Sequence, residues 1–133
     1  MARFIDELKR THSNGALRAT NIDQEVVLFG WVDSRRDHGS LIFIDLRDRD
    51  GLTQIVFGPD AYQEAHDLAE QVRGEWVIGV RGSVRSRGEQ WSKKENKMVP
   101  AANPNLATGE IEVVVLEAAI FNKAETPPFE IRD

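Results

Sequence analysis

A phenylalanine on a polar strand face is the first feature of this sequence that suggests chemistry. Within the segment Ser40 to Arg47, Phe43 alternates with Asp45 and Arg47, so these side chains point to the same side of an extended chain. An aromatic ring exposed among charges is a platform on which an unstacked nucleic-acid base can lie, a contact worth ~1–3 kcal/mol per base. The alternative is that a loop or the N-terminal segment covers Phe43 and makes it part of the core.

Side chains suited to base edges or phosphates lie close to Phe43 in the sequence. Gln54 offers a donor and acceptors in one planar amide, which suits a base edge, although a solvated strand residue would look the same. Arg35 and Arg36 have the fork geometry that binds phosphate or guanine, but Asp33 and Asp37 flank them and make local ion pairs the alternative. Further along, Arg85 and Arg87 are followed by a lysine-rich segment and predict a path for phosphates, with a merely solvated loop as the alternative.

Glu112 and His38 complete the candidate binding residues. Glu112 alternates with apolar residues on the last predicted strand, where a carboxylate fits nucleic acid only if it accepts from a base or orients an arginine. His38 precedes Gly39 in a predicted turn. It is either a residue that contacts a partner or an ordinary loop histidine. The acidic residues show no pairing typical of acid–base catalysis, and the three histidines are scattered. We therefore predict no catalytic residue and no metal site in this chain.

Composition defines the broad class of protein. The 133 residues, of which 41% are hydrophobic and 29% charged, fit one globular domain. The net charge is −5, yet six basic and two acidic residues fall between Arg81 and Lys97, which is compatible with nucleic-acid binding on one face. No 18-residue apolar run or targeting pattern is present, so we predict no membrane association. The absence of cysteine fits the reducing cytoplasm.

Alternating and helical hydrophobic patterns predict five strands and one helix. The strands are expected over Val26 to Asp33, Ser40 to Arg47, Leu52 to Phe57, Trp76 to Arg87 and Ile111 to Phe121. Apolar residues at helical spacing predict a helix from Pro59 to Arg73. Asp50 and Gly51 predict a tight hairpin turn, and the composition of residues 88–109 predicts a loop.

The order of these elements predicts an all-β fold. Three strands, a helix and two strands match the OB-fold, a five-stranded Greek-key barrel with a helix between strands 3 and 4. An SH3-like barrel is the alternative, which the long helical insert after strand 3 disfavours. We predict an N-terminal segment over residues 1–24, the barrel over residues 25–122, and the start of a linker to a further domain over residues 123–133.

The run from Gly30 to Phe57, GWVDSRRDHGSLIFIDLRDRDGLTQIVF, resembles the N-terminal anticodon-binding domain of bacterial-type aspartyl-tRNA synthetases, which are class II aminoacyl-tRNA synthetases. The segments RTHSNGAL (10–17), VRGSVRSR (80–87) and NPNLATGEIEV (103–113) extend the resemblance over essentially the whole chain. The related lysyl- and asparaginyl-tRNA synthetases share the domain but differ in the first run. In this family the domain is an OB-fold that binds the anticodon loop, whose bases are guanine, uracil and cytosine.

The resemblance implies a role for individual residues of this sequence. Phe43 matches the family's stacking phenylalanine, and Gln54 matches its base-reading glutamine. Arg36 matches the loop arginine, Arg87 the arginine of strand four, and Glu112 the acidic residue that reads the first base. His38 occupies a position associated with discrimination between aspartate and asparagine tRNA, and a histidine there resembles the non-discriminating kind. Two departures leave contacts unassigned: residues 88–102 are longer and more basic than in the family, and Val56 stands where some members carry an aromatic residue.

The resemblance also implies what the chain does not do alone. Class II synthetases hold ATP, with Mg²⁺, and the amino acid on a separate larger domain, so we expect this chain to bind no cofactor and to act as the recognition module of an aspartate–tRNA ligase. Its expected partner is the anticodon loop of aspartate tRNA, with asparagine tRNA as a second candidate. We expect a homodimeric parent and a monomeric isolated domain. The alternatives are a free-standing OB-fold protein that binds single strands without sequence preference, and a structural barrel with Phe43 buried.

Overall fold

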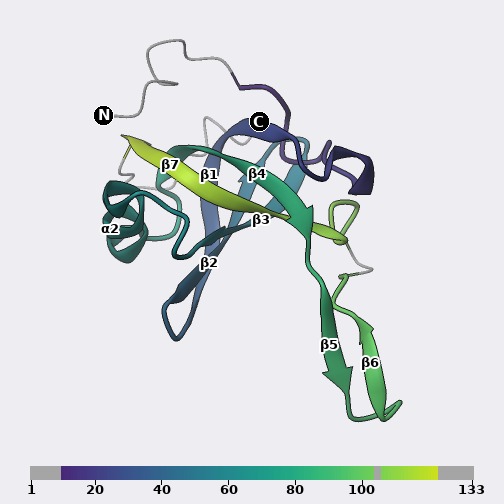
Figure 1. Cartoon of the computed structure of the whole chain (residues 1–133). Coiled ribbons are helices and arrows are strands. Elements are labelled where there is room, and N and C mark those ends of the chain that lie inside the picture. Colours follow the sequence, from purple (N-terminus) through teal and green to yellow (C-terminus); the bar gives the residue numbers. More distant parts are fainter. Residues whose placement is uncertain (1–9, 104–105, 123–133) are drawn as a thin grey trace.

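A closed five-stranded barrel forms the body of the protein in the computed structural model, which describes residues 10–103 and 106–122 (Figure 1). Its strands follow the order β1-β2-β3-β7-β4. They are β1 (Glu25–His38), β2 (Leu41–Asp48), β3 (Gly51–Phe57), β4 (Val77–Ser86) and β7 (Ile111–Asn122). One short parallel pairing, between β3 and β7, closes the barrel. The predicted OB-fold is confirmed; the predicted linker and the first nine residues lie outside the described residues.

Bulges and glycines let the strands bend around the barrel. β1 pairs with β4 through its first half and with β2 through its second half, and its register shifts between Val32 and Ser34 as the chain passes from one neighbour to the other. β4 shifts register against β7 between Arg81 and Gly82. A Cβ on Gly82 would lie 2.3 Å from the carbonyl oxygen of Val114. The two backbones therefore approach closely because this residue has no side chain.

Apolar side chains on alternate positions of the strands fill the barrel. Those almost fully excluded from solvent include Leu28, Val32, Ile44, Leu46, Ile55, Phe57, Ile78, Val80, Val84, Ile111 and Val113. On β2 the predicted core face is confirmed: Ile42, Ile44 and Leu46 are buried, whereas Phe43 on the opposite face is half-buried. This alternation directs the polar face of β2, which carries Phe43, Asp45 and Arg47, away from the core.

The helix is shorter than predicted. Instead of extending from Pro59 to Arg73, α2 spans Gln63–Gln71. The N–H of Tyr62 donates to the carbonyl of Leu116 on β7, so the chain is tied to the barrel wall before the helix begins. The buried face of α2 packs against the barrel and consists of Ala65, Leu68 and Ala69. None of the helices in the described part of the chain has the length and apolar character needed to cross a bilayer.

The prediction of a loop over residues 88–109 is wrong in its first half. β5 (Glu89–Ser92) and β6 (Lys97–Pro100) form an antiparallel hairpin that projects from the barrel at the end of β4 (Figure 1). Trp91 pairs across the hairpin with Met98, and both side chains are about half exposed. Asn96 adopts a left-handed backbone in the turn, which asparagine tolerates well. Strands of four residues are too short to show a periodicity against a lysine- and asparagine-rich background.

Candidate nucleic-acid interface

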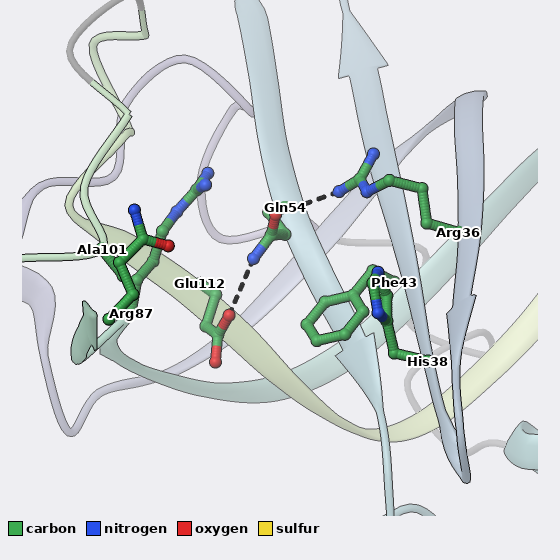
Figure 2. A pocket seen from close by; sticks show the side chains of 8 residues that line it. Arg36, His38, Phe43, Gln54, Arg87, Ala101 and Glu112 are labelled. Carbon is green, nitrogen blue, oxygen red and sulfur yellow. Dashed lines mark hydrogen bonds between the residues drawn. The ribbon is translucent and has the colours of Figure 1, made fainter. Parts of the chain in front are cut away.

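An open pocket of about 310 Å³ lies on the outer face of the barrel (Figure 2). All but one of the predicted site residues line it, namely Arg36, His38, Phe43, Gln54, Arg87 and Glu112. They come from β1, β2, β3, β7 and the chain just after β4. Gln90 and Ala101, at the base of the β5–β6 hairpin, complete the lining. The fold therefore brings residues separated by more than seventy positions into one site.

Phe43 supplies the aromatic surface of this pocket. Its ring is half-buried and contacts His38 edge-on, with centroids 5.6 Å apart and an interplanar angle of 82°. His38 is the last residue of β1 and pairs with Leu41 across the turn into β2, which places it beside the ring. Within the described part of the chain, residues 10–103 and 106–122, Phe43 is not fully buried by a loop or by the N-terminal segment. An edge-on neighbour holds the ring in place while one side remains directed into the pocket.

A chain of hydrogen bonds crosses the pocket from strand to strand. Arg36 donates from Nη2 to Oε1 of Gln54 at 3.0 Å, and Gln54 donates from Nε2 to Oε1 of Glu112 at 2.8 Å (Figure 2). Arg85 then donates from Nε to Oε2 of Glu112 at 2.7 Å. These contacts follow the strand order of the barrel, since Arg85 and Glu112 are register partners on β4 and β7. The side chains that are candidates to contact a base thereby hold one another in place.

Glu112 is the buried anchor of this chain. Its side chain is only 8% exposed, and a carboxylate at that depth needs partners for its charge. Arg85 and Gln54 provide them. Of the two roles that the sequence left open for Glu112, the structure shows the contact with an arginine, and acceptance from a base stays a prediction. Arg85 itself does not line the pocket. The bond to Glu112 uses Nε of Arg85, and the side chain is 49% exposed, so its part in a phosphate path stays a prediction.

Arg36 is paired, but not with the neighbour that the sequence suggested. Its Nη1 lies 2.9 Å from Oδ2 of Asp45 on β2, whereas Asp37 pairs with Arg35 at 3.0 Å. Successive residues of a strand point to opposite faces, so Arg36 reaches across to β2 while Arg35 and Asp37 share the other face. Arg36 remains about two-fifths exposed, and its guanidinium is available to a ligand.

Arg87 is the cation at the other end of the pocket. Its Nε donates to the carbonyl of Ile111 at 3.0 Å. Partial burial lowers the pKa of Arg87, against the opposing effects of Glu112 and Asp45, but a guanidinium stays protonated in proteins. Arg81, by contrast, pairs with Glu25 and Glu117 outside the pocket. The basic residues between positions 81 and 97 therefore do not form one continuous stripe.

Four residues of the site were not among the predicted ones. Gln90 and Ala101 line the pocket from a segment predicted as loop, and no feature of the sequence distinguishes them. Asp45 and Ser34 hold Arg36, since Nη1 of Arg36 also lies 3.1 Å from Oγ of Ser34. The alternation of Asp45 with Phe43 was the available sign that this carboxylate shares the face of the site.

We expect acid to break the ion pair between Arg36 and Asp45. Burial alone raises the pKa of the Asp45 carboxyl, but hydrogen bonds from Arg36 and Ser34 outweigh it, so the folded-state pKa lies below the ordinary value. The stabilisation is therefore complete above the ordinary aspartate pKa of about 3.9 and is lost as the pH falls through the lower folded-state value. Urea unfolding of wild type and Asp45→Asn from pH 7 downward should show their stability difference vanish in acid. A difference that stays constant with pH would contradict this.

The chain belongs to a family of OB-fold nucleic acid binding domains, the tRNA_anti-codon family, whose model matches residues 26–121. The resemblance to aspartyl-tRNA synthetases is confirmed by curated relatives. Over 133 residues the chain is 54% identical to the aspartate–tRNA(Asp/Asn) ligase of Anaeromyxobacter sp. (strain K), covering 100% of this chain and 20% of the relative. It is 49% identical over 125 residues to the aspartate–tRNA ligase of Listeria welshimeri, a match that covers 94% of this chain and 20% of that relative. The chain thus spans about a fifth of the curated relatives it matches.

Solved structures resemble this chain in fold. The aspartyl-tRNA synthetase of Entamoeba histolytica superposes with a TM-score of 0.71 at 18% identity, covering 96% of this chain and 24% of that one. The asparaginyl-tRNA synthetase of Pyrococcus horikoshii gives a TM-score of 0.64 at 21% identity, and the match covers 85% of this chain and 23% of that one. At this identity the likeness establishes the barrel architecture and no more.

Proposed function

We propose that this chain is the anticodon-binding domain of an aspartate–tRNA ligase. The observation that carries the proposal is the pocket itself, in which the half-buried ring of Phe43 lies beside an ordered row of hydrogen-bonding groups. A stacking platform next to base-edge partners is what recognition of an unstacked RNA base requires. The relatives named as aspartate–tRNA ligases, matched along the full chain, support this assignment.

In this proposal each group has a distinct task. Phe43 stacks against one anticodon base, Arg36 and Gln54 bond to base edges, and Glu112 accepts from a base donor while it holds Arg85. Arg87 and the lysines of the β5–β6 hairpin contribute charge for the RNA backbone. Phosphate contacts supply affinity, whereas base contacts supply sequence preference.

His38 bears on which tRNAs are accepted. It lies at the pocket rim against Phe43, and several relatives carry the name aspartate–tRNA(Asp/Asn) ligase. We therefore propose that the parent enzyme charges both aspartate and asparagine tRNA. Aminoacylation of both tRNAs by the full-length ligase tests this, and failure to charge asparagine tRNA while aspartate tRNA is charged well would contradict it.

The remaining attributes of the parent are also proposals. The ATP, the Mg²⁺ and the aspartate would be bound outside this chain, in the larger part of the ligase. We propose a homodimeric parent in the cytoplasm and a monomeric isolated domain. Sedimentation of the 133-residue chain would test the last point directly.

The first test is a titration with an RNA stem-loop that carries the aspartate anticodon. A second loop, with the middle uracil changed to adenine, is the matched comparison. We expect the change to weaken binding at least tenfold, or about 1.4 kcal/mol, the order expected for one base read specifically. Equal, salt-sensitive binding to both loops would favour the sequence-independent single-strand binder, and no binding would favour a structural barrel.

Exposed lysines of the hairpin turn should contribute to affinity without regard to sequence. Lys93 and Lys94 lie at the tip of the β5–β6 hairpin, whose base lines the pocket. Replacing both with alanine should weaken cognate and variant loops alike and reduce the slope of log K against log[salt] by about 0.7 to 0.9 for each phosphate that the protein no longer neutralises. Arg73→Ala, just beyond α2, removes one positive charge away from the pocket and is the control. An unchanged slope in the lysine variant would exclude the hairpin from the RNA interface.

A further inference from the structure

The orientation of the Gln54 amide follows from its two neighbours. The guanidinium of Arg36 only donates hydrogen bonds, and the carboxylate of Glu112 only accepts them. The amide oxygen must therefore face Arg36, at 3.0 Å, and the amide nitrogen must face Glu112, at 2.8 Å. A flipped amide would oppose donor to donor and acceptor to acceptor. One N–H and one lone pair of the amide remain for a ligand.

Arg36 owes its own position to Asp45. The carboxylate of Asp45 accepts from Nη1 at 2.9 Å and from Nη2 at 3.3 Å, a two-point attachment that holds the plane of the guanidinium. Ser34 braces the pair, because its Oγ donates to Oδ2 of Asp45 at 2.8 Å. The nitrogen that donates to Gln54 is one of the two that Asp45 holds.

The strand register makes this support part of the barrel. Asp45 is the register partner of Ser34 on β1 and of Gln54 on β3, so the carboxylate sits between the two strands whose side chains it connects. Asp45 does not itself line the pocket, and its side chain is 20% exposed. It is therefore placed to act on a ligand through Arg36 and Gln54 rather than by contact.

We propose that Asp45 is a positioning residue for base specificity, because by holding Arg36 it secures one of the two hydrogen bonds that fix the donor–acceptor polarity of the Gln54 amide. This inference rests on the proposed function, since it concerns how the anticodon is read. Without the charge of Asp45, the guanidinium of Arg36 loses its two-point attachment and keeps the single contact with Oγ of Ser34. It can then turn toward solvent or phosphate, and the Gln54 amide is held from the Glu112 side alone. A base edge whose donors and acceptors are reversed relative to the cognate base is then repelled less strongly by the Gln54 amide, and selectivity between bases falls.

The test compares Asp45→Asn with Asp33→Asn in the 133-residue chain. Asp33 is the matched control, because its ion pair with Arg47, at 3.1 Å, also joins β1 to β2 but lies outside the pocket. Kd is measured for the aspartate anticodon stem-loop and for single-base variants at each anticodon position. We expect Asp45→Asn to reduce the ratio of variant to cognate Kd by about tenfold at one position or more, and Asp33→Asn to leave it unchanged. An equal loss of affinity for every loop, with the ratio preserved, would overturn the proposal.

A second readout needs no RNA. The side-chain amide of Gln54 gives its own NMR signals, which should shift in Asp45→Asn and not in Asp33→Asn; coincident signals in all three proteins would overturn the positioning role. If wild type binds every loop alike, the proposed function fails, and the NMR result alone then decides the inference. Should Asp45→Asn not fold, Ser34→Ala replaces it, since it removes the brace but keeps the ion pair. Ser34→Ala should reduce selectivity less than Asp45→Asn does. If Ser34→Ala leaves the selectivity unchanged, that result counts against the proposal.

Discussion

Phe43→Ala is expected to weaken binding of the aspartate anticodon stem-loop by about 1–3 kcal/mol, which is roughly 5- to 150-fold in Kd. The ring is the aromatic surface of the pocket and lies outside the barrel core, so its removal takes away a stacking platform without opening a large cavity. Binding is measured by titration, and the fold is checked by circular dichroism and thermal unfolding.

Phe121→Ala is the control for this substitution. Phe121 is also partly exposed and also contacts an aromatic neighbour edge-on, Phe29, with centroids 5.1 Å apart. It does not line the pocket, so its removal should leave RNA binding as in wild type. If Phe43→Ala leaves the dissociation constant unchanged, Phe43 does not stack against a base, and that part of the proposed function is wrong.

Gly82→Ala is expected to destabilise the barrel by about 1–3 kcal/mol, the cost of overpacking a closely fitted site. The new Cβ would stand 2.3 Å from the carbonyl oxygen of Val114 and 2.9 Å from Cγ1 of Val113. The first of these is a backbone atom of the neighbouring strand, so β4 and β7 must move apart. Urea unfolding should show a lower midpoint with an unchanged m-value.

Gly74→Ala provides the comparison for the strand glycine. An added Cβ at Gly74 meets nothing within 4 Å, so the change in unfolding free energy should stay within about 0.5 kcal/mol, as for ordinary surface substitutions. Equal stability of the two alanine variants would show that β4 and β7 tolerate a wider separation. Because Arg85 and Glu112 pair across the same two strands, Gly82→Ala should also weaken RNA binding.

The sequence alone was sufficient for the five barrel strands and for the side of β2 and β3 on which Phe43 and Gln54 lie. Alternation places Phe43 and Gln54 off the core face, and the structure confirms that both line the pocket. The burial of Ile44 and Ile55 on the opposite faces follows from the same period of two residues. These features are local, since the side to which a strand residue points depends on its immediate neighbours in the chain.

Pairing between distant side chains was decided by the tertiary structure. Asp37 is the nearer acidic neighbour of Arg36 in the sequence, yet Arg36 pairs with Asp45, because the register of β1 and β2 determines which charges meet. The β5–β6 hairpin was likewise hidden, since each strand has only four residues and its pairing does not depend on burial in a core. The order of residues thus determined which groups are available to the candidate site. The closure of the barrel determined which of them hold one another in place, because side chains more than fifty positions apart become neighbours only when the strands pair.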